Sequence, residues 1–280
     1  MKSKPIPSLP FHTFLALAIL LFAVVPYTLS GTPRDQDQLE KSLHDAYKGK
    51  TLTLRNFYSG STLEFDSHGA ALRDPKVGPW TLWSRILVDD VKLSHKTLEI
   101  DAHRLFLRYL SQDKSFQALR AGRVRLRIDL DGEPSGIRDL DPILTQLFLK
   151  AGEDFSRLVP PYWTKFCSHV SDPDWSQQES SRITHDPKTA ANGWTPPFPV
   201  YKPEPGYSHE AREAKITGAL QLLAVIDQAG HVADVMIVRP IGMGLDENAV
   251  ETVRTWRFKP AQHDGASAPV KIIIEMTFRL

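Results

Sequence analysis

The stretch that decides the fold of the C-terminal region is Gly242-Met-Gly-Leu-Asp-Glu-Asn-Ala-Val-Glu-Thr-Val-Arg-Thr-Trp-Arg-Phe-Lys-Pro-Ala261. Its apolar residues recur at intervals of three and four, which predicts an amphipathic helix. The apolar residues are Leu245, Ala249, Val250, Val253 and Trp256. Asp246 is placed to cap this helix, and Pro260 brings it to an end. Gly242 and Gly244 suit a backbone with positive φ ahead of the cap.

Strand-like segments lie on both sides of this helix. Residues 219–226 and 232–238 are joined by a turn that contains Gly230, so we expect a hairpin. Residues 270–280 alternate between apolar and polar side chains more regularly than any other segment. A short helix capped by Ser208 comes before the hairpin. The order helix, strand, strand, helix, strand predicts a small antiparallel sheet that is covered on one face by two helices.

These residues also carry a family resemblance. Four motifs occur in the same order as in the TonB C-terminal domain family: Tyr207-Ser-x-x-Ala-Arg-x-x-Lys-x-x-Gly218, Val225-x-Asp-x-x-Gly-x-Val232, Gly242-Met-Gly-Leu-Asp-Glu-x-Ala249 and Trp256-Arg-Phe-Lys-Pro-Ala261. The chain resembles this family over about residues 195–280. The resemblance implies a non-catalytic module that binds the TonB box of outer-membrane transporters by adding a strand to a sheet edge. The loop 265–270 is two residues longer than the family pattern, which leaves its contacts open.

The motif residues fall into two groups. The first group is expected to define the fold: Tyr207, Gly218, Gly242, Gly244, Leu245, Asp246, Trp256, Phe258 and Pro260. Trp256 and Phe258 straddle a helix end, so both rings can fill the interface between sheet and helix. The second group contains the candidate partner-binding residues, which are Arg212 and the outward side chains of the last strand, Lys271, Ile273, Glu275 and Thr277. We expect the partner to bind along this strand's edge.

The N-terminal 30 residues resemble a targeting segment. Lys2 and Lys4 precede an apolar run at 14–25, which is the order found in a secretory signal peptide. The alternative is a membrane anchor formed by residues 9–29, although this span contains two prolines and a histidine. Both alternatives place the rest of the chain outside the cytoplasm, in the periplasm or cell envelope.

Residues 31–150 predict a separate mixed α+β domain rich in antiparallel strands. Helical spacing covers 37–47 and recurs after Gly132, and strands are expected at 51–57, from 63, and within 80–93, 97–110 and 123–130. The strand from residue 63 is expected to return along 51–57 after a turn at 59–61. No ligand chemistry is evident in this domain.

Residues 151–206 are expected to be a proline-rich linker, with the TonB-type domain at 207–280. Nine of the 21 prolines lie in 160–206, and proline favours an extended, semi-rigid chain. Three tryptophans, Trp163, Trp175 and Trp194, favour the alternative of an ordered loop packed on one domain.

Several function classes are disfavoured. The formal net charge is +1 and neither half has a basic excess, so nucleic acid is not an expected partner. The sole cysteine, Cys167, permits no intrachain disulfide. His209-Glu210 begins like a zinc-protease helix, but Glu213 stands where the second histidine is required. We therefore expect no enzyme activity, no cofactor and no metal.

Two functions from different classes remain. The first is a TonB-like adaptor that contacts transporters in energy-coupled transport, which requires a membrane anchor and an ExbB/ExbD-type proton channel as a second partner. The second is a periplasmic protein-binding or assembly module with no energy-transducing role. Ser8 and His12 have the spacing of the family's anchor helix, but Pro10 lies between them and both precede the apolar run.

Overall fold

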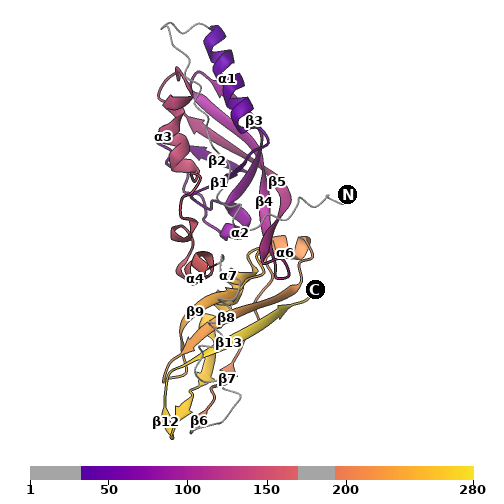
Figure 1. Ribbon diagram of the computed structural model, residues 1–280, viewed down its shortest axis with the longest axis vertical. Helices are drawn as coiled ribbons and strands as arrows, with labels where there is room; N and C mark the ends of the chain where they lie inside the picture. The colour runs from indigo at the N-terminus through magenta and orange to yellow at the C-terminus, as the bar shows by residue number, and fades with distance from the viewer. Residues whose placement is uncertain (1–32, 170–192) are drawn as a thin grey trace. The chain divides into compact units, whose positions relative to one another are not determined.

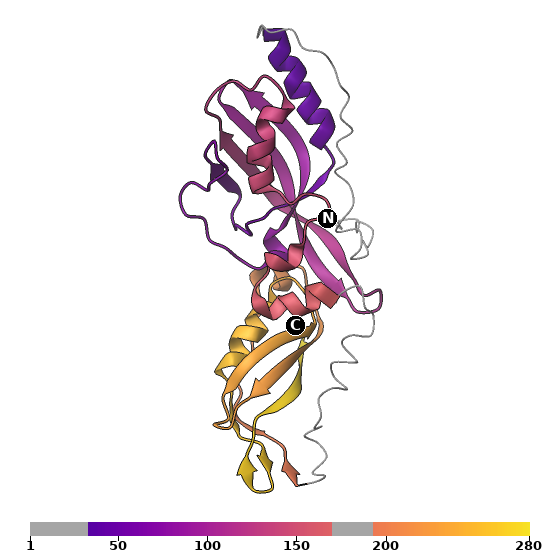
Figure 2. The ribbon, with the colours of Figure 1, turned by 60° about the vertical axis from the view of Figure 1, so that its left-hand side comes forward.

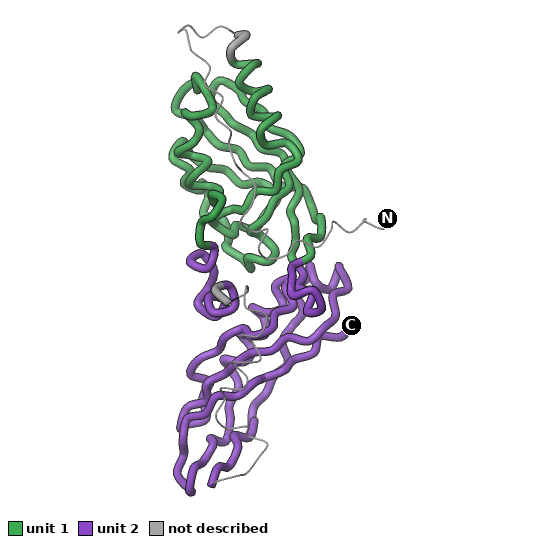
Figure 3. The backbone as a smooth tube through the Cα atoms, viewed as in Figure 1, with its two compact units in different colours: residues 1–107, 117–154 green, residues 108–116, 155–280 purple. Residues whose placement is uncertain are grey.

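The computed structural model describes residues 33–169 and 193–280 (Figure 1). The predicted signal peptide or anchor, residues 1–30, lies outside the described residues. The chain forms two compact units (Figure 3): the first comprises the residues up to 107 together with 117–154, and the second comprises 108–116 together with 155–280. Each unit is a mixture of helices and mostly antiparallel strands.

The first unit is built on a five-stranded sheet. Its elements in chain order are α1 (Pro33–Tyr47), β1 (Thr51–Thr53), β2 (Thr62–Phe65), α2 (Trp80–Trp83), β3 (Arg85–Ser94), β4 (Thr97–Leu110), β5 (Ser115–Asp129) and α3 (Ile137–Leu147). The strand order is β1-β3-β4-β5-β2, and β2 pairs parallel with β5. The tip of the β4–β5 hairpin, 108–116, belongs to the second unit.

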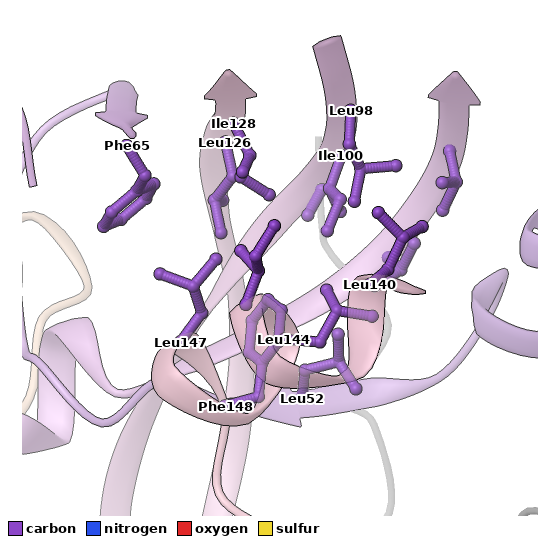
Figure 4. Close-up of a cluster of buried hydrophobic side chains, with 14 of the residues drawn as sticks. Leu52, Phe65, Leu98, Ile100, Leu126, Ile128, Leu140, Leu144, Leu147 and Phe148 are labelled. Atoms are coloured by element: carbon purple, nitrogen blue, oxygen red, sulfur yellow. The ribbon is translucent and has the colours of Figure 1, made fainter. Parts of the chain in front are cut away.

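The core of the first unit lies between one face of the sheet and the helices α1 and α3. Figure 2 shows both helices on the same side of the strands, and buried leucines from both helices join one apolar cluster. Figure 4 shows part of this cluster, in which side chains of α3 meet those of β4 and β5. On β5 the residues Val124, Leu126 and Ile128 are buried while the arginines between them are exposed, as the alternation predicts.

The predicted hairpin between 51–57 and the strand from residue 63 is wrong. β1 and β2 lie at opposite edges of the sheet, and β2 runs parallel to β5. The buried guanidinium of Arg104 holds the intervening loop, because it donates to the carbonyls of Tyr58 (2.9 Å) and Gly60 (3.2 Å). The expected strand at 80–93 also begins late, because residues 80–83 form the helical turn α2.

Each edge of this sheet is paired in part with another segment of the chain. The outer side of the β1 segment pairs with residues 147–149, where Leu149 N donates to Thr53 O (2.9 Å) and Arg55 N donates to Leu147 O (2.9 Å). On the outer side of β2, Leu72 N donates to Glu64 O (2.8 Å). These contacts occupy backbone groups that would otherwise accept a further strand.

The second unit contains the C-terminal motifs. Its elements are η2 (Phe155–Arg157), α4 (Pro161–His169), β6 (Trp194–Thr195), β7 (Phe198–Tyr201), α6 (His209–Glu213), β8 (Gly218–Ile226), β9 (Val232–Arg239), α7 (Leu245–Thr255), β10 (Arg257–Lys259), β11 (Gln262–His263), β12 (Ala266–Ser267) and β13 (Val270–Phe278). The main sheet is antiparallel with the order β13-β8-β9, and Figure 1 shows β8 between the other two strands. The predicted hairpin and last strand are therefore confirmed.

The helices of the second unit agree with the expectation only in part. Both α7 and α4 contact β9. The predicted helix after Ser208 is α6, which ends at Glu213 rather than reaching Gly218. It stays a prediction that the two helices after Tyr207 cover one face of the sheet.

The prediction that residues 151–206 form a linker is wrong for residues 155–169. This segment forms η2 and α4, and Trp163 and Phe166 are buried. Further along, β7 pairs with β10 and β6 pairs with β11. Buried indole and phenyl rings remove enough apolar area from water to hold a segment that the proline count alone marks as extended.

The β5 alternation gives a stability test for the first unit. Leu126→Ala should lower the free energy of unfolding by about 2 to 5 kcal/mol, because it opens a cavity in the core. The matched control is the exposed neighbour Arg127→Ala, whose effect should stay within about 0.5 kcal/mol. Urea denaturation monitored by circular dichroism measures both values. Equal losses for the two variants would contradict the assigned faces of β5.

Candidate functional site

The free edge of β13 is the candidate partner site. β13 pairs with β8 over nine residues, from Val270 opposite Ile226 to Phe278 opposite Gly218. No strand in the described parts of the chain pairs with its other side. Inward side chains of β13 are buried, whereas Lys271, Glu275 and Thr277 are exposed and Ile273 is half-buried. The strand therefore presents backbone donors and acceptors along an accessible edge.

Glu275 is held within the sheet rather than left free. Its Oε2 accepts from Gln221 Nε2 on β8 (2.9 Å) and from Arg239 Nη2 on β9 (3.0 Å). The three side chains thus form a row across all three strands. An exposed row of this kind contributes little to stability but fixes the orientation of Glu275. Lys271, by contrast, takes part in no ion pair among the described residues.

Arg212 lies close to the end of β13 through two aromatic contacts. Its guanidinium stands over the Tyr207 ring at 5.3 Å. The Tyr207 ring in turn meets Phe278 edge-on, with 5.3 Å between the ring centroids. The Tyr207 hydroxyl donates to Ile216 O (3.2 Å), which ties the ring to the segment between α6 and β8. The structure therefore brings Arg212 near the Phe278 end of the candidate edge.

Asp246 does not cap α7 in the predicted way. The N-cap residue is Gly244 with a left-handed backbone, and Asp246 lies in the first turn of the helix. Its carboxylate reaches back to accept from Ile241 N (2.9 Å) and Gly242 N (2.6 Å). The sequence pattern identified a residue that satisfies backbone donors, but the donors belong to the preceding turn rather than to the helix.

The turn at 241–244 needs backbone conformations that glycine supplies. Gly242 and Gly244 have φ of 86° and 76°, and Met243 between them has φ of 59°. Burial raises the pKa of Asp246, and the neighbouring Glu247 carboxyl raises it further. The two N–H donors oppose this rise, because they stabilise the ionised form.

The remaining motif residues pack against one another. Trp256 is 3% exposed, and its Nε1 donates to Pro203 O (3.0 Å). Its ring lies 6.1 Å from that of Phe258, which is also buried. Pro260 directly follows the short strand β10, which is separated from α7 by Trp256 alone. A Cβ at Gly218 would stand 2.8 Å from Ile241 Cδ1, so this glycine allows a close approach to the turn before α7.

Sequence reasoning missed one part of this unit, which we call the cap: the hairpin tip 108–116 together with 155–169. Trp163 on α4 donates from Nε1 to Glu247 Oε1 (2.8 Å), so the cap reaches the first turn of α7. Tyr109 and Phe116 of the hairpin tip stack edge-on with Phe166 of α4. The available signal was the presence of indoles in the proline-rich region.

The residues considered for metal binding and catalysis lie as follows. In the described parts of the chain, no group of three or more His, Cys, Asp or Glu side chains could hold a metal ion. His209 and Glu213 are both exposed, with 3.9 Å between Nδ1 and Oε2. Cys167, on α4, is half-buried.

The C-terminal segment is similar to a known protein family. Residues 203–280 match the family model described as Gram-negative bacterial TonB protein C-terminal. The predicted resemblance to the TonB C-terminal domain family is confirmed for this segment. The TonB-like segment is also similar to the solution NMR structure of the Pseudomonas aeruginosa TonB CTD, with 19% identity and a TM-score of 0.26, covering 30% of this chain and 86% of that chain. No curated protein matches the chain.

Asp246 provides a test of the turn in the TonB-like segment. Asp246→Ala leaves two buried N–H groups without their acceptor, at about 1 to 3 kcal/mol each, so the free energy of unfolding should fall by at least about 2 kcal/mol. Asp246→Asn keeps one acceptor oxygen and should lose less. Glu251→Ala, at an exposed position on the same helix, is the control for helix propensity and charge. If urea denaturation shows that Asp246→Ala loses no more free energy of unfolding than Glu251→Ala, the Asp246 carboxylate does not hold the turn.

Proposed function

We propose that the chain is an exported, TonB-like protein of the cell envelope whose C-terminal segment binds an extended segment of a partner protein by strand addition at β13. The family match supports a TonB-like role in transport at a general level. The proposed partners are TonB box-like segments of outer-membrane transporters. Binding requires no cofactor and no catalysis, because an added strand is held by main-chain hydrogen bonds.

The observation that carries this proposal is the free, nine-residue edge of β13. The short edge strands of the first unit's sheet, β1 and β2, each pair on their outer side with another segment of the chain. The opposite edge strand of the second unit, β9, contacts α4 and α7. β13 is thus a nine-residue edge strand with no partner strand on its outer side among the described residues, which favours pairing with an added strand.

β7 is less suited to strand addition although its side chains are exposed. Phe258 N donates to Gly230 O (2.9 Å), so the backbone groups of Phe258 point away from β7. Pro199, which pairs with Phe258, must therefore direct its nitrogen to the free edge of β7. Because proline has no N–H, this edge lacks the donor that an added strand requires.

Export, localisation and energy coupling belong to the proposal as well. No helix in the described ranges 33–169 and 193–280 is long and apolar enough to cross a membrane. If residues 9–29 anchor the chain in the inner membrane, an ExbB/ExbD-type proton channel becomes the second partner. If the segment is cleaved, the chain is a periplasmic binding or assembly module. Membrane fractionation with N-terminal sequencing of the mature protein decides between them.

Proline substitution tests strand addition directly. Thr277→Pro and Lys271→Pro each remove one N–H from β13, while Thr277→Ala and Lys271→Ala change the side chain alone. Residues 271 and 277 are an even number of positions apart, so both N–H groups point to the same side of the strand. If that side is the free edge, the proline variants should lose binding of a transporter-derived peptide and the alanine variants should keep it. Fluorescence polarisation measures the affinity.

Two controls complete this test. Circular dichroism identifies proline variants that have lost the fold instead of the edge donor. Two N-methylated peptides, one methylated at odd and one at even positions, each lack the backbone donors of one side. The peptide that lacks the donors facing β13 should not bind. Unchanged affinity in both folded proline variants and with both N-methylated peptides would rule out strand addition at β13.

A further inference from the structure

The cap lies outside the segment that matches the TonB family. That match begins at residue 203, whereas the cap consists of 108–116 and 155–169. Within the second unit, α4 contacts β9, the edge strand on the far side of the sheet from β13. This chain therefore adds a helix of its own to the far edge of a TonB-like sheet.

α4 is joined to the TonB-like segment by a buried polar contact. Trp163 is fully buried, and its Nε1 donates to Glu247 Oε1 at 2.8 Å. Glu247 is itself only 7% exposed. The second carboxyl oxygen of Glu247 is buried and has no hydrogen-bond partner within the described structure. A buried carboxylate with one oxygen unsatisfied is costly, whereas a neutral carboxyl group costs much less.

We propose that Glu247 and Trp163 form a proton-controlled latch that holds α4 firmly on β9 and α7 while the Glu247 carboxyl is neutral, and loosens α4 when it ionises. The latch is independent of which partner binds β13. Its release would uncover the edge of β9 without unfolding the sheet. It thereby offers a second strand edge whose accessibility follows pH.

The groups around Glu247 are unfavourable to its negative charge. Asp246 precedes it in the sequence, and Glu251 lies one turn further along α7. The nearby cation is Arg254, whose guanidinium stands over the ring of Tyr162 on α4 at 5.5 Å and so interacts with that ring. Burial is the main cause that raises the pKa of Glu247 to about 7; Glu251 contributes to this rise and the Trp163 donor opposes it.

The direction of the pH effect follows from linkage. When α4 leaves, Glu247 meets water and its pKa returns toward the ordinary value of 4.5. At any pH between these two pKa values, Glu247 is therefore protonated in the docked form and ionised in the released form. Docking is strongest below about pH 4.5, weakens as pH rises, and has lost this contribution above about pH 7.

The hairpin tip keeps its own attachments, so only α4 needs to move. Tyr109 N donates to Ile241 O (2.9 Å), and Arg108 forms an isolated bridge with Gly242. These main-chain contacts contain no group that titrates between pH 5 and 8. The aromatic contacts of Phe166 with Tyr109 and Phe116 hold α4 without any charge, so ionisation weakens the docking but does not abolish it.

Amide hydrogen exchange of the full chain tests the latch. Protection of residues 161–167, corrected for the intrinsic exchange rate, should fall on the order of tenfold between pH 6 and pH 8. Glu247→Gln cannot ionise and should show no such fall. The matched control Glu251→Gln removes a charge from an exposed position one turn away and should keep a fall, moved to slightly lower pH because Glu251 raises the pKa of Glu247.

A second variant separates the latch from simple packing. Trp163→Phe retains a buried ring but removes the N–H that favours the ionised carboxylate, so its fall in protection should move to higher pH. A purely structural role for Trp163 would lower protection equally at every pH. The proposal is overturned if the natural protein shows no pH-dependent fall, if Glu247→Gln retains it, or if Trp163→Phe leaves its position unchanged; circular dichroism verifies that each variant is folded.

Discussion

The turn from Ile241 to Gly244 is the constraint on which the second unit depends. Two of its backbone N–H groups are held by the buried carboxyl group of Asp246, which fixes the turn against the helix that follows it. With the turn fixed, Ile241 O accepts from Tyr109 of the cap, and Met243 O accepts from the Ser208 hydroxyl at the start of α6 (2.6 Å). One buried acidic side chain therefore organises contacts from three distant parts of the sequence.

The same arrangement makes the two edges of the sheet unequal. β9 contacts α4 and α7, and the Trp163–Glu247 hydrogen bond joins these two helices. β13 has β8 on one side only, and its outward side chains include charges that discourage indiscriminate pairing. The open, charged edge of β13 is therefore the place where the proposed partner strand would join this sheet.

Local patterns in the sequence were sufficient for much of this account. The alternation in 270–280 and 123–130 predicted β13 and the faces of β5, because side chains of a half-buried strand alternate whatever the partner strand is. Partner choice was beyond such patterns. β2 follows β1 closely in sequence, yet it pairs with β5, since pairing is decided by the whole sheet. The helical turn at Trp80 was hidden because a four-residue segment shows no helical period.

The candidate site was predictable in its residues but not in its surroundings. Lys271 and Thr277 lie on the free edge strand where the period placed them, whereas the engagement of Glu275 by Arg239 requires the register of three strands. Asp246 was recognised as a residue that satisfies backbone donors, but the donors lie upstream because the turn folds back on the helix. The cap was missed because its buried indole and phenyl rings come from segments that are distant in sequence and follow no period.

If an extended partner segment joins the sheet at β13, its binding must protect the backbone of that strand. The most direct measurement is residue-level amide hydrogen exchange of the full chain, with and without a saturating peptide from the N-terminal segment of an outer-membrane transporter. Strand addition predicts new protection within residues 270–278, with none at β7 and little change along β9. Protection confined to β7, β9 or α4, with β13 unchanged, would contradict the account.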